Sequence, residues 1–205
     1  LGNRHPFISE NGGAVFIPKK YFNFKFRYDK KDKNYFIIQL GTDYKKLVRI
    51  LKKIQKKYPL KMFYEMSPKA LAKDTGLTLK QAKLAKQREF DEAFQIVNPA
   101  HKRIVFAEIK KNGFRYTVGG RYAHIMGNSD KGKAVKILNT LFMKKFGTIE
   151  TIGLGDSEND FAMLDKVDKP YLVMKKNRQY ASQEYKKAGA VGPVGWQKII
   201  LKLLK

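Results

Sequence analysis

Five side chains that carry oxygen follow one another in a short stretch of the chain. Asp156, Glu158 and Asp160 are acids, and Ser157 and Asn159 alternate with them. Three acids this close repel one another unless a positive charge lies among them. Because oxygen ligands suit a hard cation such as Mg²⁺, the spacing favours metal or phosphate chemistry. The alternative is a capped helix N-terminus, where a serine caps and acids interact favourably with the helix dipole.

The stretch lies where a buried strand is expected to end and a helix to begin. Residues 149–154 are mostly apolar, which is typical of a buried strand. Further along, Phe161, Leu164 and Val167 recur three residues apart, which indicates a helix. Ligands of open α/β sheets bind at the carboxyl ends of strands. We therefore expect the acids to face a ligand at such an edge.

Lys131 stands at the start of a second predicted helix, which runs to Phe146. Asn128 or Ser129 is the expected N-cap, which places Lys131 in the first turn. The helix dipole disfavours a cation there, whereas a lysine beside a helix N-terminus is a good clamp for a phosphate group. Two alternatives remain open: a lysine that faces solvent, and Lys133 in place of Lys131.

A polar strand is expected at residues 88–97. Its alternation places Arg88 on one face and Glu89 and Asp91 on the other. Charge on both faces is unusual for a core strand, so an exposed strand end is one interpretation. The other is a polar wall that holds sugar hydroxyls and a carboxylate, with Arg88 as a bidentate donor to the anion.

Three stretches resemble motifs of the haloacid dehalogenase-like phosphohydrolases. Residues 153–173 (GLGDSENDFAMLDKVDKPYLV) resemble the fourth motif, and residues 128–134 (NSDKGKA) resemble the third. Residues 6–16 (PFISENGGAVF) resemble the strand-and-turn segment of one branch of that superfamily. The similarity narrows to phosphatases of mannosyl-3-phosphoglycerate through QREFDE at residues 87–92, GGRY at 119–122 and GPVGW at 192–196.

The resemblance implies a Mg²⁺-dependent phosphatase that converts 2-O-mannosyl-3-phosphoglycerate to mannosylglycerate, with glucosyl-3-phosphoglycerate or another sugar phosphate as the alternative substrate. It implies that Asp156 binds Mg²⁺, that Lys131 stabilises the phosphate oxygens and that Asp160 orients Lys131. It also implies substrate contacts at Glu10, Asn11, Gly12, Arg88, Glu89, Arg121, Ser129 and Asn159.

The resemblance and the order of the expected elements together predict an α/β fold. We expect a haloacid dehalogenase-like core with a parallel sheet at residues 1–33 and 121–205. An α+β cap with a mostly antiparallel sheet is expected at residues 34–120, and its closure would exclude water from the site. Within the core, residues 177–187 are expected to be helical.

One part of the family pattern has no match in the chain. The family's nucleophile lies in an N-terminal D-x-D motif, and no two Asp residues are separated by one position here. We expect a fragment that lacks its first β-α-β unit, which would be inactive alone and would expose strand edges. The alternative is an inactive, basic relative that binds phosphate or nucleic acid.

The excess of positive charge is the strongest argument for an inactive relative that binds phosphate or nucleic acid. The formal net charge is +25, from 43 Lys and Arg against 18 Asp and Glu. A basic domain can bind nucleic acid non-specifically. Lysine supplies most of the charge, in pairs spread along predicted helices, and such runs are typical of solvated faces. We therefore expect a small anionic sugar phosphate rather than nucleic acid as the partner.

The composition also indicates the cellular compartment in which the protein is expected. The chain contains no Cys, which excludes disulfides, thiolate metal sites and a cysteine nucleophile. No apolar run approaches the roughly 18 residues of a membrane span. We expect a cytoplasmic protein.

Overall fold

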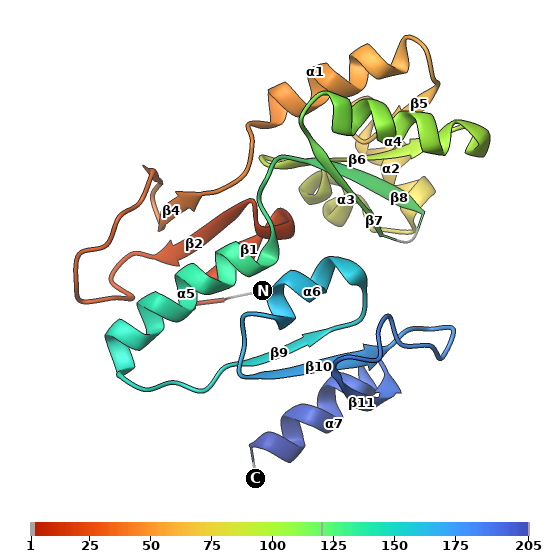
Figure 1. Cartoon of the computed structure of the whole chain (residues 1–205). Coiled ribbons are helices and arrows are strands. Elements are labelled where there is room, and N and C mark those ends of the chain that lie inside the picture. Colours follow the sequence, from red (N-terminus) through yellow and green to blue (C-terminus); the bar gives the residue numbers. More distant parts are fainter. Residues whose placement is uncertain (1–2, 120, 205) are drawn as a thin grey trace.

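The computed structural model describes residues 3–119 and 121–204, and its strands form three separate sheets (Figure 1). Two sheets and their helices form a core, and the third sheet, with helices on both faces, forms a cap above it. The parallel sheet in the core confirms the predicted α/β class. None of the helices in this part of the chain combines the length and apolar character that a membrane span requires.

The first core sheet is antiparallel, with strand order β1-β2-β4-β3. Its strands are β1 (Phe7–Ser9), β2 (Ala14–Pro18), β3 (Lys30–Lys31) and β4 (Tyr35–Gln39), and a short 3₁₀ turn (Glu10–Gly12) joins β1 to β2. The long helix α5 (Lys131–Phe146) packs against β1 and β2 through Ala134 and Leu141. This packing brings the start of α5 beside the turn.

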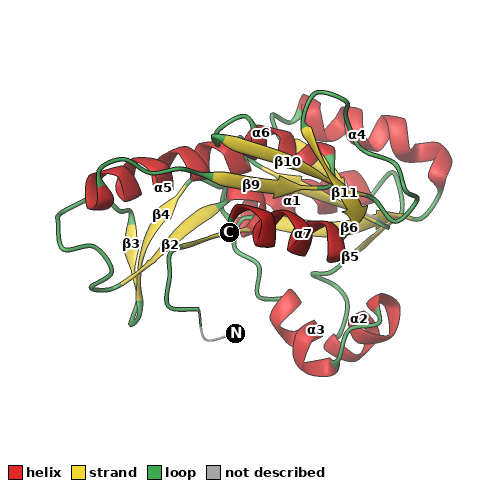
Figure 2. Cartoon of the chain, turned by 90° about the horizontal axis from the view of Figure 1, so that it is seen from below, coloured by secondary structure: helices red, strands yellow, loops and turns green. Residues whose placement is uncertain are grey.

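The second core sheet is parallel, with strand order β11-β10-β9. Its strands are β9 (Ile152–Gly155), β10 (Lys169–Met174) and β11 (Lys186–Val191). Helix α6 (Phe161–Leu164) follows β9, and α7 (Val194–Leu203) packs against β11 (Figure 2). The expected helix at residues 177–187 is wrong, because residues 177–185 form turns and bends and β11 begins at Lys186. Pairing with Tyr171 and Leu172 of β10 draws Lys186 and Lys187 into the sheet, and this tertiary contact outweighs local helix propensity.

The cap sheet is antiparallel, with strand order β5-β6-β8-β7. Its strands are β5 (Leu60–Met62), β6 (Asp91–Ile96), β7 (Arg115–Gly119) and β8 (Tyr122–Met126). Helices α1 (Tyr44–Gln55) and α4 (Lys102–Lys111, preceded by the 3₁₀ turn Pro99–His101) cover one face, and α2 (Pro68–Thr75) and α3 (Leu79–Ala85) lie on the other (Figure 1). The part of the second face that α2 and α3 leave open is turned toward the core.

Strand pairing places the change between sheets at positions other than 34 and 120, where we expected the domain boundaries. β4 pairs with β2 of the core over five residue pairs, and β8 pairs with β6 and β7 of the cap. Periodicity predicts a strand but not its neighbour, which depends on contacts distant in sequence. We therefore propose a cap of residues 43–126 and a core of residues 1–42 and 127–205.

Candidate active site

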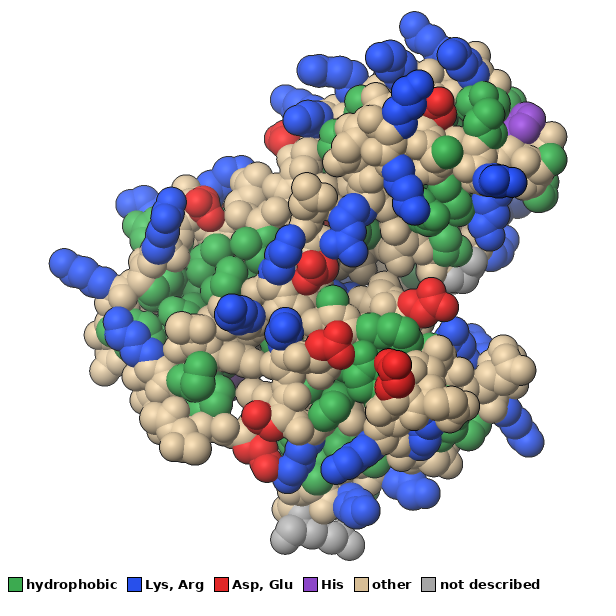
Figure 3. Space-filling view, in the orientation of Figure 1, with side chains coloured by type: hydrophobic (Ala, Val, Ile, Leu, Met, Phe, Trp, Pro, Cys, Tyr) green, Lys and Arg blue, Asp and Glu red, His purple; other side chains and the backbone are tan. Residues whose placement is uncertain are grey.

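A cleft of about 480 Å³ separates the cap from the core. The cap wall is the edge strand β7 with the end of β8, and the core wall is made by the turn after β1, the start of α5 and the segments after β9 and β10. Its lining residues are Asn11, Arg115, Tyr116, Thr117, Val118, Met126, Ser129, Asp130, Lys131, Ser157, Glu158, Asn159, Ala162 and Lys175. In the space-filling view the notch between the two units opens at one side of the molecule (Figure 3).

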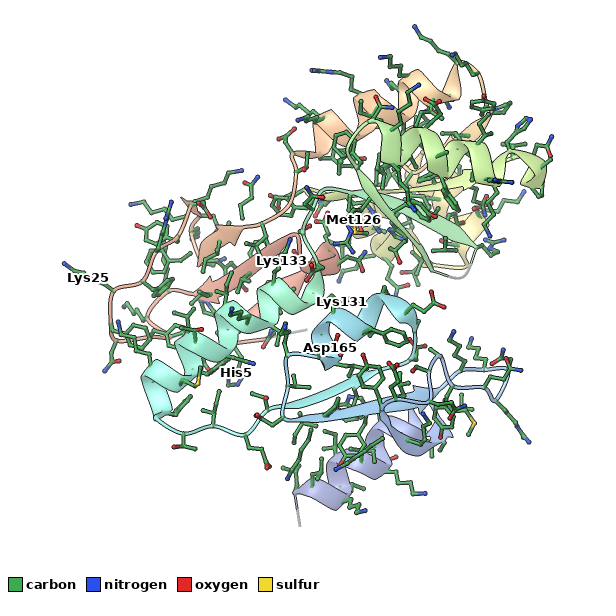
Figure 4. All side chains as sticks on the ribbon, in the orientation of Figure 1. His5, Lys25, Met126, Lys131, Lys133 and Asp165 are labelled. Carbon is green, nitrogen blue, oxygen red and sulfur yellow. The ribbon has the colours of Figure 1, made fainter. Side chains whose placement is uncertain are left out.

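Lys131 and Asp160 meet at the base of this cleft. The Lys131 Nζ donates to Asp160 Oδ1 in an ion pair, and Asp160 is only 8% exposed. The other oxygen, Asp160 Oδ2, accepts from the backbone N–H of Asp156 at 3.0 Å and of Ser157 at 3.3 Å. The Asp160 carboxylate therefore fixes the Lys131 ammonium against the turn that follows β9. Figure 4 shows Lys131 at the end of α5 that points toward this turn.

Two local features set the start of α5. Asp130 is the N-cap, because its Oδ1 accepts from the Lys133 backbone N–H at 2.9 Å, so the expected caps Asn128 and Ser129 are wrong. Gly132 lies so close to α6 that an added Cβ would be 1.9 Å from the Ala162 carbonyl oxygen. Only glycine permits this approach, which brings Lys131 within reach of Asp160.

The Asp156 carboxylate lies beside the cleft rather than among its lining residues. It is exposed, and its Oδ1 accepts from the Ser157 hydroxyl at 3.0 Å. Within residues 3–119 and 121–204, no group of three His, Cys, Asp or Glu could hold a metal ion. The oxygen donors fit Mg²⁺ in kind, because that ion is commonly bound through one or two carboxylates, with waters and substrate phosphate completing its shell.

The turn after β1 joins the core to the cap. The Glu10 carboxylate accepts from three successive backbone N–H groups at the start of β6: Glu89 at 3.0 Å, Phe90 at 2.7 Å and Asp91 at 3.0 Å. Burial raises the pKa of the Glu10 carboxyl, against the opposing effect of these hydrogen bonds. Glu10, predicted to contact substrate, is therefore a link between the two units in this structure, and Glu89 is part of that link through its backbone.

Asn11 extends the link into the cleft. Its Nδ2 donates to Asp91 Oδ2 of the cap at 3.1 Å, and its Oδ1 accepts from Asn159 Nδ2 at 3.4 Å. Gly12 has φ of +88°, and a Cβ there would lie 2.2 Å from the Asp130 backbone oxygen. The turn therefore holds the start of α5, the predicted residues Asn11 and Asn159, and the cap in one connected arrangement.

Arg88 is engaged inside the cap. It donates to the Asp91 carboxylate, which is 1% exposed and also lies 3.2 Å from His124 Nδ1. Burial, with the charge of Arg88 adding to it, lowers the pKa of the His124 imidazole to about 4. His124 is therefore neutral at pH 7 and donates its Nδ1–H to Asp91. Arg88 does not line the cleft.

Arg121 also lies away from the cleft. Its guanidinium donates to the Asp74 backbone oxygen and lies 3.7 Å from the Asp74 carboxylate. It lines a separate hollow over α4. Gly120, part of the GGRY stretch that drew attention to this region, lies outside the described residues.

The structure describes the surroundings of the predicted residue Ser129, and it adds two cleft residues that the sequence did not single out. Ser129, which was predicted, is 1% exposed, and its hydroxyl oxygen has no hydrogen-bond partner among residues 3–119 and 121–204. Arg115 and Lys175 line the cleft on opposite walls, and neither was predicted. The position of Lys175 directly after a parallel strand was a signal, since such ends face ligands. Arg115 carried no signal, because its face depends on how β7 pairs.

Comparison with known proteins places the chain in a family. Residues 1–186 match the sequence family described as haloacid dehalogenase-like hydrolase. A Methanococcoides burtonii protein named glucosyl-3-phosphoglycerate/mannosyl-3-phosphoglycerate phosphatase is 44% identical over 98% of the chain and 76% of its own length. A Pyrococcus horikoshii mannosyl-3-phosphoglycerate phosphatase is 39% identical over 92% of the chain and 73% of its own length.

Solved structures share the fold. A Thermoplasma acidophilum protein matches 98% of the chain and 73% of its own with a TM-score of 0.61 and 19% identity. A subclass IIB sugar phosphatase of the same superfamily matches with a TM-score of 0.57 and 13% identity, over 98% of the chain and 75% of its own. These two neighbours share with the chain an α/β fold of the hydrolase type. The chain belongs to the haloacid dehalogenase-like hydrolases, and its curated relatives in that family are phosphatases.

Proposed function

We propose that the protein is a Mg²⁺-dependent phosphatase that removes the phosphate of 2-O-mannosyl-3-phosphoglycerate to give mannosylglycerate. Glucosyl-3-phosphoglycerate is the second candidate substrate, because the name of the 44% identical relative includes both sugars. The observation that carries the proposal is the Lys131–Asp160 pair at the N-terminus of α5 in a cleft between core and cap. The phosphatase identity of the relatives favours this over a basic, inactive binding protein.

In this proposal, the core wall binds the phosphoryl group. The N-terminus of a 16-residue helix favours an anion, and Lys131 adds a full positive charge at the same point. Asp160 holds the ammonium in place, so the positive charge is preorganised where negative charge develops during phosphoryl transfer. Asn159 and the Ser129 hydroxyl would donate further hydrogen bonds to phosphate oxygens from the same wall.

Asp156 would hold the Mg²⁺ ion, which supplies charge neutralisation for the phosphoryl oxygens. Its backbone is anchored by Asp160, so the metal ligand and the lysine share one support. The acceptor carboxylate of the family's D-x-D motif has no match among the 205 residues, so the present residues supply charge compensation and substrate enclosure.

Phosphate release from the two candidate substrates tests the proposal directly. The natural protein should release phosphate from mannosyl-3-phosphoglycerate with Mg²⁺, and excess EDTA or Asp156→Ala should abolish release. The 205-residue chain alone should release none, because it contains no D-x-D pair. Steeply salt-dependent nucleic-acid binding that Asp156→Ala leaves unchanged, together with no phosphate release, would overturn the proposal in favour of a binding protein.

A further inference from the structure

Two cations in the cleft have charges that no buried carboxylate offsets. Arg115 stands on the cap wall, on the sheet face that it shares with its pairing partner Met126. Lys175 stands on the core wall, directly after β10. They differ from Lys131, whose charge is already committed to Asp160.

The surroundings of Arg115 leave it available to a ligand. Its nearest carboxylate is Asp130, whose Oδ2 lies 3.6 Å from the Arg115 guanidinium, and the arginine side chain is 53% exposed. Exposed ion pairs of this kind contribute little to stability, so a bound anion can compete for the guanidinium. Arg88 differs from Arg115, because it pairs with Asp91, which is 1% exposed. The Asp91 carboxylate therefore compensates the Arg88 charge inside the cap.

The Lys175 ammonium is less engaged by carboxylates than the Arg115 guanidinium. Within residues 3–119 and 121–204, no carboxylate oxygen lies within 4.0 Å of its ammonium nitrogen, and the side chain is half-buried. Glu158 is a lining acid that would oppose an anion, but it is exposed and enters no salt bridge in this part of the chain. The uncommitted positive charge in the cleft therefore lies with Arg115 and Lys175.

A phosphatase site needs only one set of groups for the phosphoryl oxygens, and the core wall provides it. A second, separate set of cations fits a substrate with a second anionic group. The cleft volume of about 480 Å³ falls in the range of small-molecule sites. The guanidinium of Arg115 matches a planar carboxylate in geometry, because it can donate two parallel hydrogen bonds.

We propose that Arg115 and Lys175 bind the substrate's carboxylate and so select phosphoglycerate esters over phosphate monoesters that lack one. The inference rests on the proposed phosphatase function and adds a specificity role to residues that the motifs did not mark. Closure of the cap brings Arg115 down onto the carboxylate, so the bound substrate links the two walls.

The test compares substrates and ligands that differ by the carboxylate. With the natural protein, Arg115→Gln and Lys175→Gln should each lower kcat/KM for mannosyl-3-phosphoglycerate by about 10- to 100-fold, mainly through KM. The same variants should change kcat/KM for p-nitrophenyl phosphate, which has no carboxylate, by less than about threefold. Lys176→Gln is the matched control, because Lys176 is the exposed neighbour of Lys175 and does not line the cleft.

A binding experiment separates this inference from the phosphatase proposal. Calorimetry compares 3-phosphoglycerate with glycerol 3-phosphate, which replaces the carboxylate by a hydroxymethyl group. The unaltered protein should bind 3-phosphoglycerate more tightly, and Arg115→Gln with Lys175→Gln should remove that preference. Equal affinities in the unaltered protein, or equal losses for both ligands, would overturn the inference even if phosphate release is normal. A retained preference without phosphate release would instead reject the proposed function alone.

Discussion

The two walls of the cleft are built in different ways. On the core wall the critical side chains come from short stretches, and backbone hydrogen bonds within those stretches position them: Asp160 bonds to the amides of Asp156 and Ser157. On the cap wall each side chain is placed by strand pairing, as Arg115 is by its register opposite Met126. The core wall is therefore a local construction, whereas the cap wall depends on the whole cap sheet.

The difference between the walls predicts which substitutions lower activity and which lower stability. A change of Lys131 on the core wall should reduce catalysis more than stability, because its side chain is 27% exposed and Asp160 keeps its hydrogen bonds to two backbone amides. A change in the network behind the cap wall should weaken the fold first, since Arg88 and His124 both contact the buried Asp91 carboxylate.

Lys131→Ala should produce the largest effect on activity. Removal of one preorganised charge that faces the transition state lowers kcat by about 10²- to 10³-fold. Steady-state phosphate release by the natural protein measures this loss, and the melting temperature shows whether the fold is kept. Lys133→Ala is the control, because the Lys133 side chain is 58% exposed two residues further along α5. Equal losses for the two variants would remove the assignment of the phosphate to Lys131.

Arg88→Met should produce the largest effect on stability. It leaves the Asp91 carboxylate buried without its cationic partner, and breaking a buried pair costs about 3–5 kcal/mol. Arg115→Met, which breaks the exposed pair with Asp130, should cost less than about 1 kcal/mol.

Urea unfolding of the two variants under one set of conditions measures this contrast. Similar midpoints would show that the two arginines are equivalent and that burial behind the cap wall does not matter. A low midpoint for Arg115→Met alone would reverse the assignment of the two residues.

The two kinds of wall also explain what the sequence could predict. The α/β class, Lys131 at the start of its helix and Asp160 within its turn all follow from patterns spanning a few residues, and the structure brings these two side chains together. Arg88 and Arg121 were chosen from motifs on predicted strands. The structure pairs Arg88 with Asp91 and Arg121 with Asp74, and the local pattern of a strand does not show which of its side chains such partners engage.

The dependence on long-range contacts also accounts for the predictions of the fold that the structure contradicts. Residues 35–39 were expected within the cap, yet the pairing of β4 with β2 places this strand in a core sheet. Residues 177–187 were predicted as a helix, but the structure has turns and bends at 177–185 and the start of β11 at 186–187, and the place of β11 in the sheet depends on its pairing with β10. Local sequence patterns predict where helices and strands lie, whereas long-range strand pairing decides which of them are neighbours in the fold.

Acid should weaken the cap network through His124. The His124 pKa of about 4 in the folded protein lies below its ordinary value of about 6.5, so the unfolded chain binds more protons between these pH values. Stability should therefore rise with pH across this window, by at most about 3 kcal/mol. Burial also raises the pKa of Glu10 and of Glu92, and these groups act in the opposite direction as pH rises above about 4.5.

A comparison with His124→Asn isolates the contribution of the imidazole. Asparagine keeps a donor near the position of Nδ1 but cannot gain a proton, so the variant's stability should rise less between pH 4 and pH 6.5 than that of the unaltered protein. Urea midpoints at several pH values give both slopes. Identical slopes would mean that His124 keeps its ordinary protonation in the folded cap.

A pair of glycines gives the smallest contrast and tests the joint between the walls. Gly12 and Gly113 have similar positive φ angles, +88° and +79°, so alanine costs about 1–2 kcal/mol of backbone strain at either position. An added Cβ at Gly113 meets nothing within 4 Å, whereas at Gly12 it lies 2.2 Å from the Asp130 backbone oxygen. Gly12→Ala must therefore shift the start of α5 and with it Lys131. We expect Gly12→Ala to be less stable than Gly113→Ala by about 1–2 kcal/mol in urea unfolding and, unlike it, to weaken binding of inorganic phosphate. Equal phosphate affinities in the two variants would show that the turn after β1 does not position the phosphate site.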